Sequence, residues 1–328
     1  MPSLSPDGPD QIGAAVRVLA SGGLVAFPTE TVYGLGAAAD DPAAVARVFR
    51  VKGRPTAHPL IVHVAKAAAL SALTPELSRA AERLAEKFWP GPLTLVVRRG
   101  GSVLPSVTGG QDTVAVRVPD HPIALELLGA FERPIAAPSA NRFGGVSPTT
   151  AEHVQRDLGR AVDLVLDGGA CTVGLESTIV DLTGAAPLVL RPGGVPLEAL
   201  SDALGETVRC GARDDLRAPG GLPSHYAPEA RVLVCEANEL DSRVAELAKL
   251  GARVGVLAPA EVPVPGGVRA SLVVADAGAY ARALYAALRD FDAQGMDVVV
   301  AVPPPTAGLG HAILDRLSRA AAPRPESD

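Results

Sequence analysis

Cysteine, aromatic residues and lysine are scarce in this chain of 328 residues. Its three cysteines, Cys171, Cys210 and Cys235, are far apart and form no C-x-x-C pair, so the sequence predicts neither a disulfide framework nor a zinc site. One Trp, four Tyr and six Phe are too few rings for a base-stacking platform. Thirty Lys and Arg against 36 Asp and Glu leave a net charge of −6, which argues against a basic surface for nucleic acid or anionic membrane.

Long apolar runs are also missing. No stretch of about 18 uncharged apolar residues occurs, so we expect no membrane-spanning segment. Residues 1–10 lack the basic and apolar regions of a signal peptide. Together with the scattered thiols, these features predict a cytoplasmic protein.

Length and patterning predict an α/β protein with two domains, because one core rarely exceeds about 250 residues. A segment rich in charge, Gly and Pro interrupts the pattern after Cys210. We therefore predict a catalytic domain over 1–210, a linker over 211–229 and a smaller domain over 230–328.

The periodicity of apolar residues predicts the elements of both domains. In the first domain, strands are expected over 24–27, 60–64, 93–97, 113–118, 135–137, 164–166, 178–182 and 188–190, and helices over 11–20, 43–51, 75–88 and 150–158. In the second, strands are expected over 232–234, 254–257, 272–274 and 298–302, and helices over 242–250, 279–291 and 312–320. Thr183-Gly184 joins a predicted hairpin, so the first sheet should be mixed, whereas the second should be mostly parallel.

Familiar nucleotide signatures are absent or incomplete. None of the four lysines follows a glycine, which excludes a Walker A loop. Gly34-x-Gly36-x-x-Ala39 formally fits the dinucleotide pattern, but no helix clearly opens at Gly36 and no acidic residue stands about 20 positions on. We interpret this stretch as a glycine-rich turn.

Several segments nevertheless contain more polar groups than a loop requires. Each has an ordinary explanation alone, such as a turn, a helix cap or a solvated strand face. These segments are Thr29-Glu30-Thr31, Lys52-Gly53-Arg54, Arg117, Ser139-Ala140-Asn141 with Ser147, Glu176-Ser177-Thr178 and Arg191-Pro192-Gly193.

Together they resemble the YrdC/Sua5 family, whose order and spacing match over residues 22–193. The resemblance rests on Thr29-Glu30-Thr31-Val32-Tyr33-Gly34-Leu35, Lys52-x-Arg54, Trp89-Pro90-Gly91-Pro92-Leu93-Thr94, Ser139-Ala140-Asn141, Glu176-Ser177-Thr178-Ile179 and Arg191-Pro192-Gly193. His225-Tyr226-Ala227-Pro228 and the second α/β domain resemble the longer Sua5 branch. The resemblance implies a YrdC-like twisted mixed sheet with a concave active-site face, plus a smaller Rossmann-like C-terminal domain.

The resemblance also implies an activity. Members of this family, which are nucleotidyltransferases, form threonylcarbamoyl-AMP and pyrophosphate from L-threonine, bicarbonate and ATP, for the modification of adenosine 37 in tRNA. Mg²⁺ is expected to accompany ATP, without a metal site on the protein. The expected downstream partner is the tRNA threonylcarbamoyl-transfer machinery, and neither membrane association nor stable nucleic-acid binding is expected.

Site residues carry over from matching positions. The resemblance implies that threonine contacts Thr31, His63, Arg117, the backbone at Ala137, and Ser177. It implies that the nucleotide contacts Arg54, His58, Thr113, Ser139, Asn141, Ser147, Arg191 and the linker residue Tyr226. Lys52 and Arg54 are expected to be catalytic, because they can stabilise charge that develops on the phosphates.

The linker departs from the family pattern. This chain has Gly221-Leu222-Pro223-Ser224 where the family typically has a methionine, basic residues and a tyrosine. We therefore expect the linker to act as a lid without supplying positive charge to the phosphates.

Two other functions remain open. One is a double-stranded RNA-binding module, which the net charge and the scarcity of aromatic residues disfavour. The other is a carbamoyl-transfer relative that shares an adenylating site but uses carbamoyl phosphate. Pyrophosphate release with ATP, bicarbonate and individual amino acids distinguishes all three.

Overall fold

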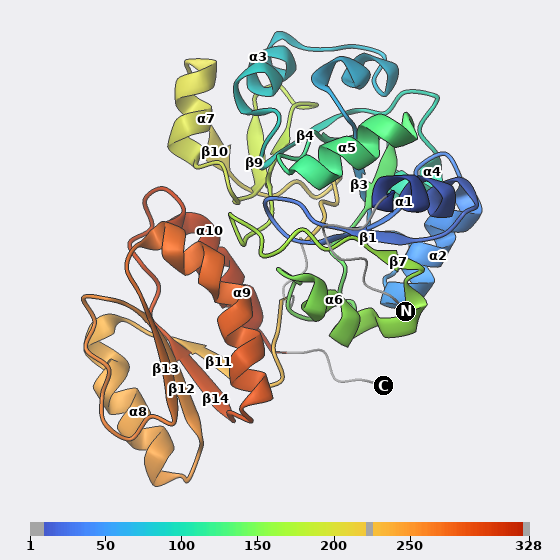
Figure 1. Cartoon of the computed structure of the whole chain (residues 1–328). Helices are drawn as coiled ribbons and strands as arrows, with labels where there is room; N and C mark the ends of the chain where they lie inside the picture. Colours follow the sequence, from blue (N-terminus) through green and yellow to red (C-terminus); the bar gives the residue numbers. More distant parts are fainter. Residues whose placement is uncertain (1–9, 221–225, 324–328) are drawn as a thin grey trace. The chain divides into compact units, whose positions relative to one another are not determined.

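The computed structural model describes residues 10–220 and 226–323, and these form two compact units (Figure 1). The first unit comprises 1–143, 147–172 and 176–221, and the second comprises 144–146, 173–175 and 222–328. Residues 1–9, which are expected to lack a signal peptide, and residues 221–225, which include the departure in the linker and His225, lie outside the described residues.

The first unit is built on one mixed sheet, as predicted. Within the described residues its strand order is β10-β9-β8-β4-β5-β3-β6-β2-β1-β7. The pairs β1/β7, β3/β5, β4/β8 and β9/β10 are parallel, and the others are antiparallel, including the predicted β8/β9 hairpin. The strands are β1 (Val25–Phe27), β2 (Gly34–Ala38), β3 (Ile61–His63), β4 (Leu93–Arg98), β5 (Thr113–Arg117), β6 (Ile135–Ala137), β7 (Leu164–Val165), β8 (Thr178–Asp181), β9 (Leu188–Arg191) and β10 (Arg209–Cys210).

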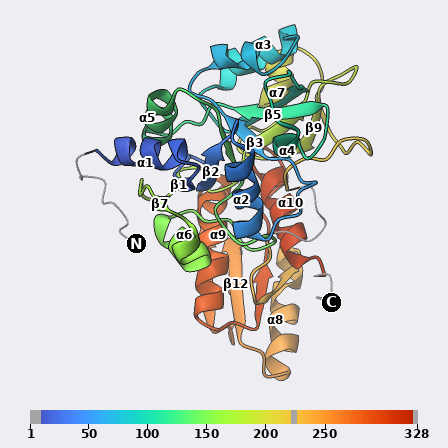
Figure 2. The ribbon, with the colours of Figure 1, turned by 90° about the vertical axis from the view of Figure 1, so that its right-hand side faces the viewer.

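Helices cover this sheet and carry polar residues at their ends. Helix α2 (Pro42–Lys52) begins with Asp41, whose carboxylate accepts from two backbone N–H groups, and it ends at Gly53 in the left-handed region. Figure 2 shows α1 and α5 side by side, and their apolar residues belong to one hydrophobic cluster. The helices are α1 (Gln11–Ala20), α2, α3 (Arg79–Phe88), α4 (Pro105–Thr108), α5 (Pro122–Phe131), α6 (Ala151–Leu158) and α7 (Leu197–Leu204), with short 3₁₀ helices at Ala67–Ala72 and Gly159–Ala161.

The glycine-rich turn predicted at Gly34-x-Gly36 is wrong, because these residues form strand β2. Gly36 pairs with Val25 and Gly34 with Phe27 in an antiparallel ladder. A Cβ atom on Gly36 would lie 2.8 Å from both the Phe27 ring and the Ile135 side chain. Glycine is therefore needed here for close packing against Phe27 rather than for a turn.

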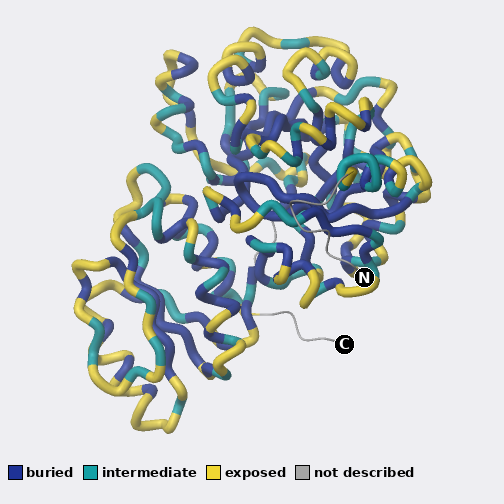
Figure 3. Tube along the Cα trace, viewed as in Figure 1, coloured by how far each residue is buried: buried dark blue, intermediate teal, exposed yellow. Residues whose placement is uncertain are grey.

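The second unit is a small three-layer α/β sandwich with a parallel sheet, as predicted. Its strands β11 (Arg231–Val234), β12 (Val254–Pro259), β13 (Ala270–Val274) and β14 (Val298–Ala301) pair in the order β11-β14-β12-β13. Helix α8 (Leu240–Lys249) packs on one face, and α9 (Ala277–Ala293) and α10 (Gly310–Ala321) on the other, with a 3₁₀ turn at Ala237–Glu239 (Figure 1). Figure 3 shows the central strands of both units buried, whereas strands at the sheet edges, such as β10 and β13, carry exposed residues. Across the described residues, no helix has the length and apolar character needed to span a membrane.

Candidate functional site

The two faces of the first sheet differ in chemistry. One is packed in the main hydrophobic core through residues such as Val62, Val116 and Val180. Residues paired across a ladder point to the same side, as do alternate residues of a strand. By this rule the opposite face carries five of the predicted site residues, namely His63, Thr113, Arg117, Ala137 and Arg191.

His63 and Arg117 end neighbouring parallel strands and are direct partners in the ladder. Their relative exposures are only 4% and 3%. Thr31, in the segment after β1, reaches the same point, because Arg117 Nη1 donates to Thr31 Oγ1 at 2.8 Å. Three residues predicted to bind threonine therefore form one buried cluster.

Glu30 joins this cluster through Arg117. Its Oε1 atom lies 2.6 Å from Arg117 Nη2, and both side chains are almost fully buried. Arg117 Nε also donates to the carbonyl oxygen of Gly91 at 3.3 Å. The sequence motif contained Glu30, but the resemblance assigned it no role.

His63 is neutral in this environment. Burial, and then the positive charge of Arg117, lower the pKa of His63 to about 3. Its ring packs edge-on against Phe27, with ring centroids 5.8 Å apart. Its Nδ1 atom is buried and has no hydrogen-bond partner within the described residues. His63 can therefore offer a neutral ring nitrogen to a ligand.

Ser177, just before β8, meets Arg191, which ends β9. Arg191 Nη2 donates to Ser177 Oγ at 3.1 Å and to the Ser177 carbonyl at 2.7 Å. Ser177 Oγ also lies 2.7 Å from Thr94 Oγ1. A Cβ atom on Gly193 would come within 2.3 Å of the Glu176 carbonyl oxygen, so only glycine allows this close approach.

Lys52 connects its own motif to Ser139-Ala140-Asn141. Its Nζ donates to the carbonyl oxygens of Ser139 and Asn141, each at 2.5 Å. Burial, and then the charge of Arg54, hold the pKa of Lys52 well below its usual value.

Arg54 lies next to His58 and Phe143. Its Nη2 donates to the Pro59 carbonyl at 3.0 Å, and its guanidinium lies 5.7 Å from the centre of the Phe143 ring. Burial, then Arg54, then Arg217, lower the pKa of His58. Arg217 therefore adds positive potential here, although it belongs to the predicted linker. Its contacts were invisible in the sequence, because they involve distant backbone carbonyls.

Ser147 is fully buried and donates to Glu176 Oε1 at 2.6 Å. This bond joins the segment before α6 to the one before β8.

Tyr226 belongs to the second unit and is buried there. Its ring stacks on Tyr285 with centroids 5.7 Å apart, and the Arg316 guanidinium lies 5.0 Å from its centre. Its φ of 62° is rare for a tyrosine. The predicted role of Tyr226 in nucleotide binding stays a prediction.

The segment 211–219 lies over the site face of the first sheet. Leu216 and Ala218 pack against a small apolar cluster formed by Ile61, Val96, Ala115 and Ile179. Arg217 fixes the segment by donating to the carbonyl oxygens of Ala57 and Gly109, each at 3.0 Å. Arg191 Nη1 donates to the Pro219 carbonyl at 3.2 Å. The first half of the predicted linker is thus attached to the site face.

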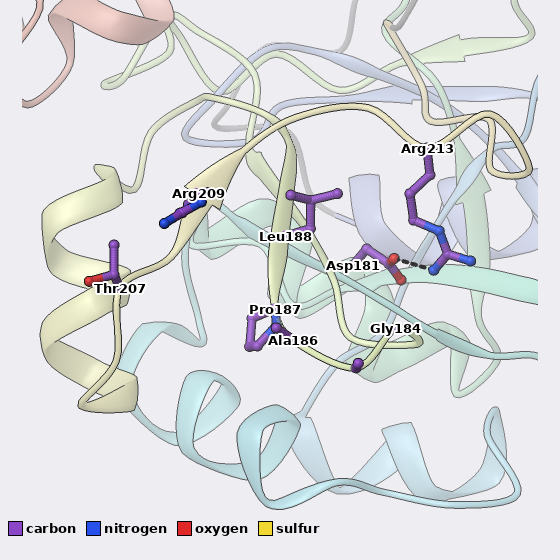
Figure 4. Close-up of a pocket in the computed structure, with 9 residues that line it drawn as sticks. Asp181, Gly184, Ala186, Pro187, Leu188, Thr207, Arg209 and Arg213 are labelled. Atoms are coloured by element: carbon purple, nitrogen blue, oxygen red, sulfur yellow. Dashed lines mark hydrogen bonds and ion pairs between the residues drawn. The ribbon is translucent and has the colours of Figure 1, made fainter.

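A depression of about 520 Å³ lies beside this segment (Figure 4). Its wall includes buried Asp181, which forms an ion pair with Arg213 at 2.7 Å. None of the predicted site residues lines it. We interpret the Asp181–Arg213 pair as an anchor for the beginning of the linker.

The mixed sheet and the buried charged residues on one of its faces define an α/β protein with a polar candidate site. A family model of Sua5, YciO and YrdC, described as "Telomere recombination", matches residues 17–193. A second model, "Threonylcarbamoyl-AMP synthase, C-terminal domain", matches residues 195–322. The chain belongs to the two-domain Sua5 branch of the YrdC/Sua5 family, which confirms the resemblance.

Relatives match over nearly the whole chain. The threonylcarbamoyl-AMP synthase of Pyrococcus abyssi is 43% identical over 96% of this chain and 95% of its own length. The threonylcarbamoyl-AMP synthase of Bacillus subtilis is 41% identical over 96% of this chain and 94% of its own length. The crystal structure of P. abyssi Sua5 complexed with L-threonine superposes with a TM-score of 0.89 at 43% identity, covering 94% of each chain. The crystal structure of Escherichia coli YciO covers 57% of this chain and 92% of its own, at 29% identity and a TM-score of 0.50.

Proposed function

We propose that this protein is an L-threonylcarbamoyladenylate synthase, a nucleotidyltransferase that converts L-threonine, bicarbonate and ATP into threonylcarbamoyl-AMP and pyrophosphate. The observation that carries the proposal is the buried cluster of Thr31, His63 and Arg117 on the site face of the sheet. The identity to two threonylcarbamoyl-AMP synthases over nearly full length supports it.

The threonine end of the site is this cluster together with Ser177 and the backbone at Ala137. The Arg117 guanidinium suits a two-pronged grip on the substrate carboxylate. Thr31 and Ser177 provide hydroxyl groups that can bind the substrate hydroxyl.

The nucleotide end contains the cations. Lys52 and Arg54 stabilise the negative charge that develops on the phosphates and on the pyrophosphate leaving group, and Arg191 supports them. No covalent protein intermediate is needed, because the carbamate oxygen attacks the α-phosphorus directly. The remaining contacts to ATP are proposed to come from His58, Thr113, Ser139, Asn141, Ser147 and Tyr226.

Exclusion of water is the second requirement, since carbamates are labile in water. The segment 211–219 already packs on the site face through Leu216 and Ala218. We propose that this segment, as part of a linker over 211–229 between domains 1–210 and 230–328, closes over the bound substrates. The C-terminal domain then supports the lid.

Mg²⁺ is the proposed metal, and it would enter bound to ATP. Among the described residues, no group of three or more His, Cys, Asp or Glu side chains is arranged to hold a metal ion. Mg²⁺ bound to a nucleotide takes most of its ligands from phosphate and water, so the polar side chains around Lys52 suit that arrangement. It would neutralise charge on the triphosphate.

The product is an activated, labile carbamoyl adenylate, so it must pass quickly to an enzyme that modifies tRNA. We propose the cytoplasmic tRNA threonylcarbamoyl-transfer machinery as that partner.

Pyrophosphate release tests the proposal. The purified protein is supplied with ATP, Mg²⁺ and bicarbonate, together with threonine, serine, valine or no amino acid. Release that requires threonine and bicarbonate is expected. Pyrophosphate release when carbamoyl phosphate replaces threonine and bicarbonate would indicate the carbamoyl-transfer relative. Salt-sensitive binding of double-stranded RNA without any turnover would indicate the RNA-binding module.

A further inference from the structure

Glu30 is a buried carboxylate whose hydrogen-bonding capacity is not used. Its relative exposure is 4%, and neither carboxylate oxygen has a hydrogen-bond partner within the described residues. Oε1 has the Arg117 guanidinium 2.6 Å away as its ion-pair partner, whereas Oε2 has none. Buried carboxylates are costly unless they are paired and hydrogen-bonded, so an unused oxygen at this position calls for a donor.

Two neighbours complete the cluster around Glu30. Arg117 Nη2 is the ion-pair partner of Glu30 Oε1 at 2.6 Å, and His63 Nδ1 is buried and has no hydrogen-bond partner within the same residues. The cluster thus offers an unused acceptor at Glu30 Oε2, a cation at Arg117 and a ring nitrogen at His63. A ligand that contains a cationic donor and an anionic acceptor close together suits the two charged groups.

An α-amino acid is such a ligand, because its ammonium and carboxylate groups are attached to the same carbon. We propose that Glu30 binds the α-ammonium group of the amino-acid substrate, while Arg117 binds the α-carboxylate. This assignment rests on the proposed function, which makes threonine the substrate. Glu30 and Arg117 together carry no net charge, and neither does the zwitterion, so binding leaves no buried charge unbalanced.

The assignment gives Glu30 a positioning role in the reaction. The ammonium group must lose one proton to water before the neutral amine reacts with bicarbonate to give the carbamate and water, and a hydrogen bond from that amine to Glu30 fixes the direction of the nitrogen. The carbamate nitrogen retains one hydrogen, which can still donate to Glu30 Oε2. The subsite also selects for a free primary amine, because a hydroxy acid has no cationic donor for Glu30.

The alternative is that Glu30 only orients Arg117. Two threonine analogues separate the two roles. Threoninol keeps the amine and replaces the carboxylate with an alcohol, whereas 2,3-dihydroxybutanoate of matching stereochemistry keeps the carboxylate and replaces the amine with a hydroxyl. If a change at Glu30 removes an ammonium contact, the affinity for threoninol falls and the affinity for dihydroxybutanoate is retained. If the change misplaces Arg117, the affinity for dihydroxybutanoate falls and the affinity for threoninol is retained.

The experiment measures the affinity of the full-length protein for L-threonine and both analogues by calorimetry, with Glu30→Gln and the exposed Glu86→Gln as a matched control. Glu30→Gln is expected to lower the affinity for threonine and threoninol by about tenfold or more, because a charged hydrogen bond is lost. The affinity for dihydroxybutanoate is expected to fall by less than about threefold. Equal losses for all three ligands, or a loss confined to dihydroxybutanoate, overturn the proposal.

Wild-type protein provides a test that does not depend on the variant folding. It is expected to bind threonine at least about tenfold more tightly than dihydroxybutanoate. Equal affinity would overturn the role of Glu30 even if threonine-dependent pyrophosphate release is observed. A wild-type protein that neither binds threonine nor releases pyrophosphate contradicts the proposed function itself.

Discussion

Lys52 Nζ lies 2.5 Å from the backbone carbonyl oxygen of Asn141, which joins two motifs 89 residues apart in the sequence. The Asn141 side-chain oxygen is also within 3.3 Å. A second hydrogen bond joins the same two segments, because the Phe143 N–H donates to the Lys52 carbonyl at 2.9 Å. The end of α2 and the segment after β6 are therefore held together by a buried ammonium group.

Binding of ATP should be accompanied by proton uptake at Lys52. Burial and then Arg54 lower the pKa of Lys52 in the ligand-free protein, so its ammonium form is less favoured there than in a free lysine. A bound triphosphate favours the charged form and raises the pKa. Calorimetry in two buffers of different ionisation enthalpy measures the uptake. It should disappear in Lys52→Gln and persist in the exposed Lys87→Gln. Undiminished uptake in Lys52→Gln would assign the proton to another group.

Arg54→Ala should slow pyrophosphate release strongly. Loss of one charge-stabilising donor costs about 2–4 kcal/mol of transition-state stabilisation, which lowers kcat/KM by a factor of roughly 30 to 1000. The control is Arg50→Ala, an exposed arginine in helix α2, which ends at Lys52 just before Arg54, and this variant should retain normal kinetics. Near-normal turnover of Arg54→Ala would remove Arg54 from the catalytic residues.

Local patterns predicted the elements well where apolar periodicity was strong. The helix ending at Lys52 and the β8/β9 hairpin are examples. Helix α5 was missed because its sequence is apolar almost throughout, and its cap is unusual: the His121 ring accepts from the Ile123 N–H. Strand β2 was missed because the reason for its glycines, the Phe27 ring, is contributed by another strand.

The site was reached through motif resemblance rather than periodicity. The sequence alone could not show that His63 and Arg117 are partners in a ladder, because such pairing depends on strand register. It also could not show that Arg217 lies near His58, since the segment 211–219 is held by backbone carbonyls from other parts of the chain.

Gly36→Ala should destabilise the first unit. The new methyl group would lie 2.8 Å from the Phe27 ring and the Ile135 side chain, so both must shift, at a cost of about 1–3 kcal/mol. Urea denaturation measures the change. Gly101→Ala is the matched control, because no heavy atom lies within 4 Å of its added methyl group. Equal stability of the two variants would contradict the packing role of Gly36.

Acid should destabilise the protein through His63. Its pKa is about 3 in the folded chain against 6.5 for the unperturbed group, so between these values the unfolded chain binds a proton that the folded chain does not. The free energy of unfolding therefore falls as the pH decreases through this range. His63 contributes a slope of about 1.4 kcal/mol per pH unit.

The test compares urea denaturation of wild type and His63→Asn at several pH values within this range, with the exposed His311→Asn as control. The free energy of unfolding of the wild type should fall more steeply with decreasing pH than that of His63→Asn, by the slope of one proton. The slope for His311→Asn should equal that of the wild type. Parallel curves for wild type and His63→Asn would mean that His63 titrates normally in the folded chain.

Arg217→Ala should loosen the attachment of the segment 211–219 and weaken the binding of ATP. The side chain supplies two hydrogen bonds to the carbonyl oxygens of Ala57 and Gly109, and its positive charge lies near His58. Hydrogen exchange of the amides in 211–219 should become faster, because opening of the segment requires less free energy. The KM for ATP should rise while the KM for threonine changes little, because Arg217 is not part of the threonine cluster.

Arg217→Lys separates charge from anchoring: it keeps the charge but cannot reproduce the forked contact, so exchange should remain fast while the KM for ATP partly recovers. Unchanged exchange in Arg217→Ala would show that Leu216 and Ala218 hold the segment without it.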